Sequence, residues 1–183
     1  GDYSRFISQK TQITLWKQLC TKHDFNIKHT IVHGGETRFQ SVKNGLMALP
    51  DNDTIVGIHD GVRPLITQDL ITRLFKAAKE KGNAVPAISI NDSLRIIDTK
   101  TLSNKYLNRS TIRSIQTPQC FVLTNLRNAF NQPYQTTFTD EATVLETTGE
   151  TINLIEGEIT NIKITTPADL QVAEILLKKI KKD

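Results

Sequence analysis

Helical patterns alternate with short apolar runs along most of this chain, and no other feature constrains its fold as strongly. Apolar side chains recur at helical spacing within residues 9–23, 42–49 and 67–78. Residues 54–58, between the second and third of these patterns, form a short apolar run typical of a central parallel strand, and residues 84–90, after the third, form a second strand-like run. Helices that alternate with strands pack on a mostly parallel sheet, so we predict one α/β domain over residues 1–183.

The stretch of about 91–114 interrupts this alternation. It is largely polar, with two short apolar runs near 94–97 and 102–107. The pattern predicts a hairpin, which we call the arm, with too little apolar surface to be stable alone. A second copy of the chain is the simplest surface for it to pack against, so we expect a homodimer.

Composition and charge exclude several classes of partner. The chain has 183 residues, 38% of them hydrophobic and 23% charged, as in ordinary globular proteins. No segment approaches the roughly 18 uncharged apolar residues of a membrane span, so we expect no membrane partner. The last six residues carry four lysines and one aspartate, which is +3 of the formal +4, and this is typical of a solvated tail. We therefore expect no nucleic acid partner.

Cys20 and Cys120 lack metal-binding spacing and are typical of buried thiols in the cytoplasm.

Asp60 and Arg63 come directly after the predicted strand 54–58, in the segment 59–64 (HDGVRP). In open α/β sheets, ligands bind beyond the carboxyl ends of the strands. An aspartate there can hold a hydroxyl group or a metal ion, and an arginine can hold a phosphate through its planar fork. Alternatively, Asp60 and Arg63 pair with each other and brace a turn, and the spacing alone does not decide between the two.

Gly34 and Gly35 connect a strand-like stretch, 27–33, to a helix that contains Ser41. Glycines let the backbone approach a ligand closely, and free N–H groups at a helix start suit a phosphate or the edge of a base. Most Gly-Gly pairs only form a turn, so both interpretations stay open.

Cationic side chains occur at two further places. Residues 161–165 alternate polar and apolar side chains, which predicts a strand with Lys163 on its polar face. Lys163 is then either a solvated edge residue or a cation directed into a cleft. Arg109 and Arg113 precede a proline-containing turn at 116–119, where they could hold a phosphate monoester.

Five motifs follow one another along the chain: VHGGETRFQSVKNGL (32–46), IHDGVRP (58–64), NRSTIRSIQTPQCF (108–121), FTDEATVLE (138–146) and IEGEITNIKITTPADL (155–170). In this order they resemble the 2-C-methyl-D-erythritol 4-phosphate cytidylyltransferase family of the non-mevalonate isoprenoid pathway. The resemblance covers the chain from about residue 1 to 174. It implies a Rossmann-like nucleotide-diphospho-sugar transferase fold. It also implies an enzyme that joins CTP to 2-C-methyl-D-erythritol 4-phosphate, giving 4-diphosphocytidyl-2-C-methyl-D-erythritol and pyrophosphate.

The resemblance implies roles for particular residues. The nucleotide would be bound by Gly35, Glu36, Arg38, Ser41 and Gly61. The acceptor substrate would be bound by Asp60, Arg63, Ser93 and Thr117. Arg109 and Lys163 would position the acceptor phosphate and so carry the catalysis. Because the arm resembles one that interlocks two subunits, we expect Ser93 and Arg109 to serve the neighbouring subunit's site.

The resemblance also implies Mg²⁺, held mainly by the phosphates of CTP, and it assigns no metal ligand among these residues. The family has a Gly-rich loop that grips the triphosphate, and the first residue here resembles a position downstream of that loop. We therefore expect the 183 residues to be N-terminally incomplete and to lack that grip. Two alternatives stay open: a ribitol-5-phosphate cytidylyltransferase, or a non-catalytic dimerising or ligand-binding fragment.

Overall fold

A computed structural model describes residues 4–52 and 54–180 of the chain. The chain divides into two compact units. The first combines the residues up to Val56 with Val122–Thr151, and the second combines Gly57–Phe121 with the residues from Ile152 onward. The single-domain assignment stays a prediction.

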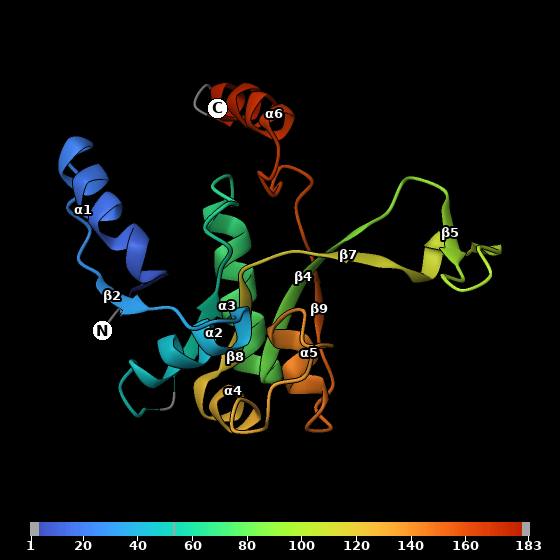
Figure 1. The fold of residues 1–183 in the computed structure, drawn as a ribbon, viewed down its shortest axis with the longest axis horizontal. Coiled ribbons are helices and arrows are strands. Elements are labelled where there is room, and N and C mark those ends of the chain that lie inside the picture. The colour runs from blue at the N-terminus through green and yellow to red at the C-terminus, as the bar shows by residue number, and fades with distance from the viewer. Residues whose placement is uncertain (1–3, 53, 181–183) are drawn as a thin grey trace. The chain divides into compact units, whose positions relative to one another are not determined.

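The first unit is built from two short parallel strands and four α-helices (Figure 1). Its elements are β1 (Arg5–Ser8), a 3₁₀ turn at Lys10–Gln12, α1 (Ile13–Lys22), β2 (Thr30–His33), α2 (Arg38–Met47), α4 (Leu123–Ala129) and α5 (Glu141–Glu146). The helix expected over 9–23 is therefore the 3₁₀ turn followed directly by α1. The strand expected over 27–33 is confined to its last four residues.

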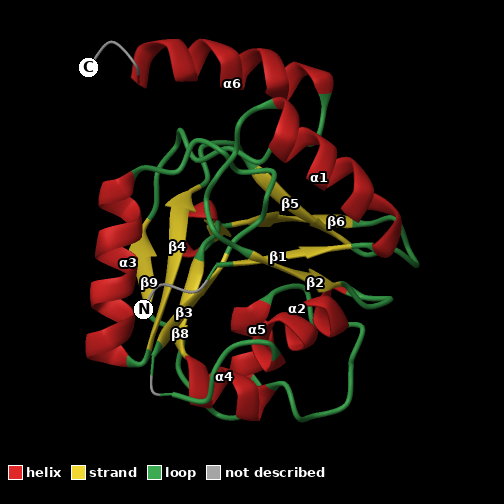
Figure 2. Cartoon of the chain, turned by 90° about the vertical axis from the view of Figure 1, so that its left-hand side faces the viewer, coloured by secondary structure: helices red, strands yellow, loops and turns green. Residues whose placement is uncertain are grey.

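Aromatic side chains form the centre of the first unit, where α2, α4 and α5 lie together (Figure 2). The Phe39 ring stacks on Phe130 at a centroid distance of 4.6 Å and on Phe138 at 5.5 Å. Arg127 of α4 donates hydrogen bonds to the carbonyls of Leu46, in the last turn of α2, and of Leu49, just beyond the helix. These contacts fix the start and the end of α2 within the unit.

The second unit contains most of the strands. Its elements are β3 (Ile55–Ile58), α3 (Gln68–Lys81), β4 (Asn83–Ser89), β5 (Leu94–Ile97), β6 (Asn104–Leu107), a 3₁₀ turn at Arg109–Thr111, β7 (Arg113–Ile115), β8 (Gln119–Val122), β9 (Leu154–Glu156) and α6 (Pro167–Ile180). The strands β3 and β8 both run across the boundary between the two units. Figure 2 shows α3 alongside β4, on which it packs.

The helix α3 confirms the prediction made from its sequence. The hydroxyl oxygen of Thr67 accepts a hydrogen bond from the Leu70 backbone N–H at 3.1 Å, which caps the first turn. The three residues expected on one face, Leu70, Leu74 and Ala78, are all fully buried. Gly82 ends the helix in the left-handed region, at φ 88°.

The α/β class is confirmed, but the described sheet is mixed and not mostly parallel. Its order is β3-β8-β4-β7, with β9 also paired to β4. The strand β4 pairs antiparallel with β7 and β8 and parallel with β9. The reason is the connection after β4: the chain leaves along the arm and returns without a helical crossover, so the next strands run in the opposite direction. The strand β3 lies at one end of this order and is only half-buried, where a central strand was expected.

Residues 161–165, predicted to be a strand, belong to no sheet within the described part of the chain. Their alternation has another cause. The Asn161 side chain is fully buried, whereas Lys163 and Thr165 are exposed. A backbone hydrogen bond of 2.8 Å, from the Ile164 N–H to the Val62 carbonyl, ties the segment to the loop after β3. The segment is therefore held by side chains and loop contacts, which alternation alone cannot distinguish from a sheet.

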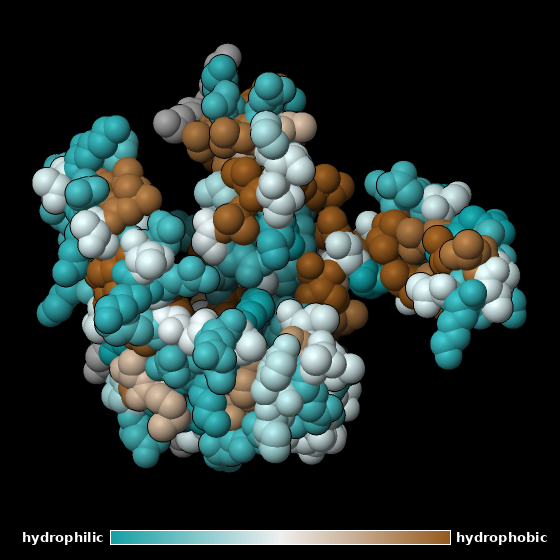
Figure 3. Space-filling model, in the orientation of Figure 1, coloured by the Kyte–Doolittle hydropathy of each residue, from teal (hydrophilic) through white to brown (hydrophobic). Residues whose placement is uncertain are grey.

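The arm is the predicted hairpin. Its strands β5 and β6 pair antiparallel, with Ile96 opposite Lys105 and Ile97 opposite Asn104. Several large side chains of the arm are exposed, and Figure 3 shows brown, hydrophobic patches on the surface of the arm. The exposed side chains are Ile96 (57% exposed), Ile97 (61%), Leu102 (78%) and Tyr106 (69%).

None of the helices in residues 4–52 and 54–180 is long and apolar enough to cross a membrane. Residues 181–183, half of the basic tail recognised in the sequence, lie outside the described residues.

Candidate active site

Asp60, Arg63 and Lys163 form a charged cluster at the carboxyl end of β3. The ammonium nitrogen of Lys163 lies 3.0 Å from Oδ2 of Asp60, and Nε of Arg63 lies 3.7 Å from the same oxygen. The turn is also closed by its backbone, since the Arg63 N–H donates to the Asp60 carbonyl at 3.0 Å. The bracing role left open for Asp60 and Arg63 is therefore real, and Lys163 joins them as a second cation.

Thr117 lies against the same turn. Its hydroxyl oxygen accepts a hydrogen bond from the Asp60 backbone N–H at 2.9 Å and lies 3.0 Å from Nδ1 of His59. The other ring nitrogen of His59, Nε2, lies 3.0 Å from the Arg63 carbonyl. His59 thus connects both ends of the turn to Thr117.

Asn161 holds the Lys163 segment in place. Its side-chain N–H₂ group donates to the Thr117 carbonyl at 2.9 Å, and its backbone carbonyl accepts from Nη1 of Arg63 at 2.7 Å. Gln116 adds a longer bond of 3.3 Å to that carbonyl. Because Asn161 is fully buried, these bonds are shielded from water and fix three loops against one another.

The cluster has an excess of positive charge, with two cations around one carboxylate. Burial lowers the pKa of Arg63, and the neighbouring Asp60 carboxylate acts in the opposite direction. Burial also lowers the pKa of His59, which favours its neutral form. A half-exposed lysine beside an arginine can bind a phosphate, while Asp60 can accept a hydrogen bond from a hydroxyl group.

Ser93 and Arg109 are placed on the arm segment, and both side chains are exposed. Nη1 of Arg109 donates a hydrogen bond to the carbonyl of Asn91. The structure thus brings together four of the predicted acceptor residues, namely Asp60, Arg63, Thr117 and Lys163, and places the other two at the base of the arm. Their service to a neighbouring subunit stays a prediction.

The predicted nucleotide residues Gly35, Glu36, Arg38 and Ser41 lie together in the first unit, at the start of α2. The Gly35 N–H donates to the Ser41 hydroxyl at 3.0 Å, and the Glu36 N–H donates to the Gln40 side chain at 3.0 Å. These two N–H groups, expected to be free for a ligand, are therefore engaged within the loop. A Cβ on Gly35 would lie 2.4 Å from the Gln40 Cβ, so this position requires glycine.

Gly61, the fifth predicted nucleotide residue, lies in the turn of the second unit. A Cβ added to it would meet nothing within 4 Å. Packing therefore does not require glycine at this position, and its role in nucleotide binding stays a prediction.

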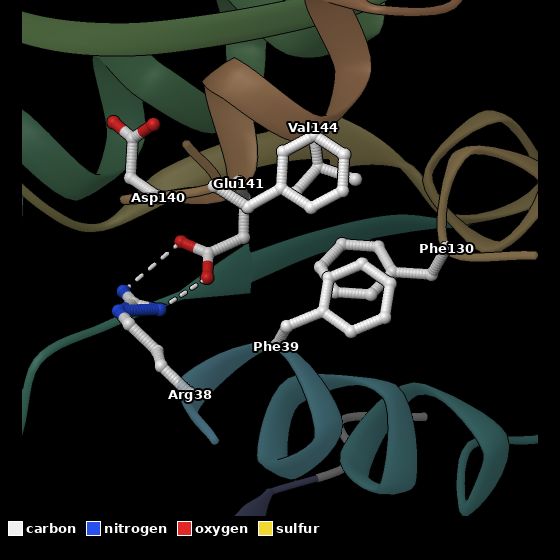
Figure 4. Close-up of a pocket in the computed structure, with 7 residues that line it drawn as sticks. Arg38, Phe39, Phe130, Asp140, Glu141 and Val144 are labelled. Carbon is white, nitrogen blue, oxygen red and sulfur yellow. Dashed lines mark hydrogen bonds and ion pairs between the residues drawn. The ribbon is translucent and has the colours of Figure 1, made fainter. Parts of the chain in front are cut away.

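Arg38 forms an ion pair with Glu141 of α5 (Figure 4). Its two terminal nitrogens reach the two carboxylate oxygens, with Nη2 at 3.1 Å from Oε2. The pair borders a small pocket lined by Arg38, Phe39, Phe130, Phe138, Asp140, Glu141 and Val144. Burial raises the pKa of Glu141 to about 7, while the Arg38 guanidinium acts in the opposite direction. Arg38 is thereby oriented by a carboxylate that carries no other ion pair in the described structure.

Sequence reasoning did not identify His59, Glu141 or Asn161 as site residues. His59 stands inside the motif 58–64 and Glu141 inside the motif 138–146, so the motifs contained the signal. Their partners, Thr117 and Arg38, are 58 and 103 residues away in the sequence, and no local pattern shows such pairs.

Within the described residues, no group of three or more His, Cys, Asp or Glu side chains could hold a metal ion. The Asp60 carboxylate of the charged cluster is engaged by Lys163.

Comparisons with known proteins agree with the motifs. The profile of the 2-C-methyl-D-erythritol 4-phosphate cytidylyltransferase family matches residues 6–179. The protein of that name from Bacteroides fragilis is 44% identical over 168 residues, which are 92% of this chain and 75% of the relative. The one from Porphyromonas gingivalis is 45% identical over 163 residues, 88% of this chain and 72% of the relative.

A solved structure has the same fold. The 4-diphosphocytidyl-2C-methyl-D-erythritol synthase from Anaerococcus prevotii superposes with a TM-score of 0.83 at 27% identity, over 97% of this chain and 79% of that one. Both the fold and the sequence thus match over nearly the whole chain, which belongs to the 2-C-methyl-D-erythritol 4-phosphate cytidylyltransferase family.

Proposed function

We propose that this chain transfers a cytidylyl group from CTP to 2-C-methyl-D-erythritol 4-phosphate. An oxygen of the acceptor phosphate bonds to the α-phosphorus of CTP, the bond from that phosphorus to the bridging oxygen breaks, and pyrophosphate leaves. The observation that carries the proposal is the cluster in which Lys163 and Arg63 surround Asp60, at 3.0 and 3.7 Å. Transfer between two phosphates depends mostly on positioning and on neutralising charge, which these side chains supply.

In the acceptor site, Lys163 and Arg63 would bind the phosphate and Asp60 would accept a hydrogen bond from a hydroxyl group of the alditol. The hydroxyl of Thr117, which is 5% exposed, is directed at the same turn and would donate to the phosphate. The hydrogen bonds of Asn161 support this arrangement, because they fix the positions of Arg63 and Thr117 relative to the segment that carries Lys163.

In the nucleotide site, Gly35, Glu36, Arg38 and Ser41 would surround the cytosine, with Gly61 adjoining the nucleotide from the turn after β3. The Arg38–Glu141 ion pair supports this assignment because it restricts the guanidinium to one orientation. The N–H groups of Gly35 and Glu36 bond to Ser41 and Gln40, and the Gly35 carbonyl accepts from the Ser41 hydroxyl at 3.4 Å, so the Glu36 carbonyl would be the polar backbone group for the base edge.

We propose that the arm joins two subunits and that Ser93 and Arg109 act in the neighbouring subunit's site. The exposed apolar side chains of β5, β6 and their connection support a partner surface. The two free cysteines support a cytoplasmic location.

Mg²⁺ completes the proposal as an ion held mainly by the phosphates of CTP. When bound, it would neutralise negative charge on the triphosphate as pyrophosphate leaves. The residues of this chain would then orient the acceptor and shield the reacting groups.

Pyrophosphate release from CTP and Mg²⁺ tests the proposal, with methylerythritol phosphate and ribitol 5-phosphate as parallel acceptors. We expect release with methylerythritol phosphate and little with ribitol phosphate. Release with ribitol 5-phosphate alone would show that ribitol 5-phosphate, and not methylerythritol phosphate, is the acceptor. No release with either compound would favour a ligand-binding fragment over an enzyme.

A further inference from the structure

The hydrogen bonds of His59 assign its tautomer. A carbonyl oxygen can only accept, so Nε2, at 3.0 Å from the Arg63 carbonyl, must carry a proton. In the neutral ring Nδ1 is then an acceptor, and its partner at 3.0 Å, the Thr117 hydroxyl, must donate to it. Neutral His59 therefore accepts the only hydrogen bond that the Thr117 hydroxyl can donate.

This use of the hydroxyl competes with acceptor binding. In the proposed function, on which this inference rests, the Thr117 hydroxyl donates to the acceptor phosphate. Its oxygen already accepts from the Asp60 N–H at 2.9 Å, so it can turn its proton to the phosphate only by leaving Nδ1. If Nδ1 gains a proton, the direction of that bond reverses: the ring donates to the hydroxyl oxygen, and the hydroxyl proton is free.

We propose that His59 is a positioning residue for the acceptor phosphate, because its protonation turns the Thr117 hydroxyl from the imidazole to the phosphate. Binding of the phosphate dianion then takes up a proton at Nδ1 of His59. An N–H bond forms at Nδ1 with a proton released by solvent or buffer, and no bond between heavier atoms changes.

The charges around His59 are suited to this coupling. From its own loop, it faces the Asp60 carboxylate, which favours the imidazolium, and the Arg63 guanidinium, which opposes it. The segment 161–163 contributes Lys163, which is paired with Asp60, and the segment 116–117 contributes no ionisable group. Burial lowers the pKa of His59 in the free protein, so the ring is neutral there at pH 7.5. A bound dianion adds negative charge nearby and raises that pKa again.

Calorimetric titration of methylerythritol phosphate into the chain tests the proposal, with CTP present and divalent metal removed so that no turnover occurs. The slope of the observed enthalpy against the ionisation enthalpy of three buffers gives the protons taken up. At pH 7.5 we expect a clear fraction of one proton for the wild type. Between pH 7.2 and 8.7 the acceptor, with a second phosphate pKa near 6, stays mostly dianionic. Its Kd should therefore weaken toward about tenfold per pH unit.

Two variants separate the proposal from a structural role. In His59→Asn the amide can donate to the Thr117 hydroxyl without titrating, so we expect acceptor binding without proton uptake and with a Kd that no longer changes with pH. In Thr117→Val, which keeps the shape, we expect about tenfold weaker binding and clearly less uptake than in the wild type, because only the charge of the phosphate then acts on His59. Uptake that persists in His59→Asn would assign the proton to another group, and undiminished uptake in Thr117→Val would exclude the hydroxyl switch.

The outcome also separates this inference from the proposed function. Binding of the acceptor without proton uptake in the wild type would overturn the role of His59 and leave the cytidylyltransferase proposal intact. Failure of methylerythritol phosphate to bind at all would contradict the proposed acceptor site itself, and the inference with it.

Discussion

The ammonium nitrogen of Lys163 lies 3.0 Å from Oδ2 of Asp60, although 103 residues separate them in the sequence. The buried Asn161 makes this contact possible by bonding both to Arg63 and to the Thr117 carbonyl. A phosphate that approaches the cluster meets a lysine whose position is already set, so little ordering is needed on binding.

Replacement of Lys163 by alanine should lower kcat/KM for the acceptor and leave the KM of CTP nearly unchanged. A charge-assisted bond to a phosphate is worth about 1.5–3 kcal/mol, so we expect kcat/KM for methylerythritol phosphate to fall roughly 10- to 150-fold. The KM of CTP should stay within about twofold. Lys79→Ala, at an exposed position of α3, is the matched control. Unchanged acceptor kinetics in Lys163→Ala would remove this residue from the site.

Mixing two impaired variants tests whether sites are shared between subunits. If Arg109 acts across the dimer, a mixed dimer of Lys163→Ala and Arg109→Ala subunits has one intact site. After equal mixing and exchange, we expect about a quarter of wild-type activity from two nearly inactive proteins. Activity no higher than the average of the two separate variants would show that Arg109 serves its own subunit or neither.

The arm should control the oligomeric state. Tyr106 is 69% exposed on β6, so Tyr106→Asp should leave the fold intact and place a charge in the subunit interface. We expect sedimentation velocity to show a dimer for the wild type, and monomers for Tyr106→Asp and for a deletion of 91–114. A dimer that survives the deletion would exclude the arm as the interface.

Two glycines should respond in opposite ways to alanine. In Gly35→Ala the new methyl group would lie 2.4 Å from the Gln40 Cβ, and such overpacking costs about 1–3 kcal/mol of unfolding free energy. In Gly61→Ala nothing lies within 4 Å, so stability should change by less than about 0.5 kcal/mol while the KM of CTP rises. Thermal unfolding and initial rates measure both effects. A stable Gly35→Ala, or a Gly61→Ala variant with unaltered CTP kinetics, would contradict the respective assignment.

Glu141 should make the stability of the protein depend on pH. Burial raises its pKa from the model-peptide value of 4.5 to about 7, so between these values the folded state holds more protons than the unfolded state. The unfolding free energy of the wild type should therefore fall as the pH rises from about 4.5 to 7, by up to about 3 kcal/mol relative to Glu141→Gln. Urea unfolding of both proteins at several pH values gives the difference. Parallel profiles would show that the pKa of Glu141 is close to its ordinary value.

The elements that could be predicted from the sequence are those set by local contacts. Thr67 with its apolar spacing defines α3, and at the start of α6 the Thr166 hydroxyl likewise accepts from the Asp169 N–H, three residues along the chain. Strand direction after β4 could not be predicted, because it depends on the arm returning the chain without a helix. The motifs contain the residues of the charged cluster and of the start of α2, whose roles stay predictions. They could not show that His59 bonds to Thr117 or that Glu141 orients Arg38, because these contacts join distant segments.

The most direct test of the account is ³¹P NMR of a reaction that contains the chain, CTP, Mg²⁺ and methylerythritol phosphate. We predict loss of the phosphate monoester signal together with growth of two mutually coupled diphosphate signals and of pyrophosphate, in equal amounts. In Lys163→Ala the same signals should grow more slowly at limiting acceptor. A monoester signal that persists while CTP is intact, or nucleotide hydrolysis without the coupled diphosphate pair, would contradict the account.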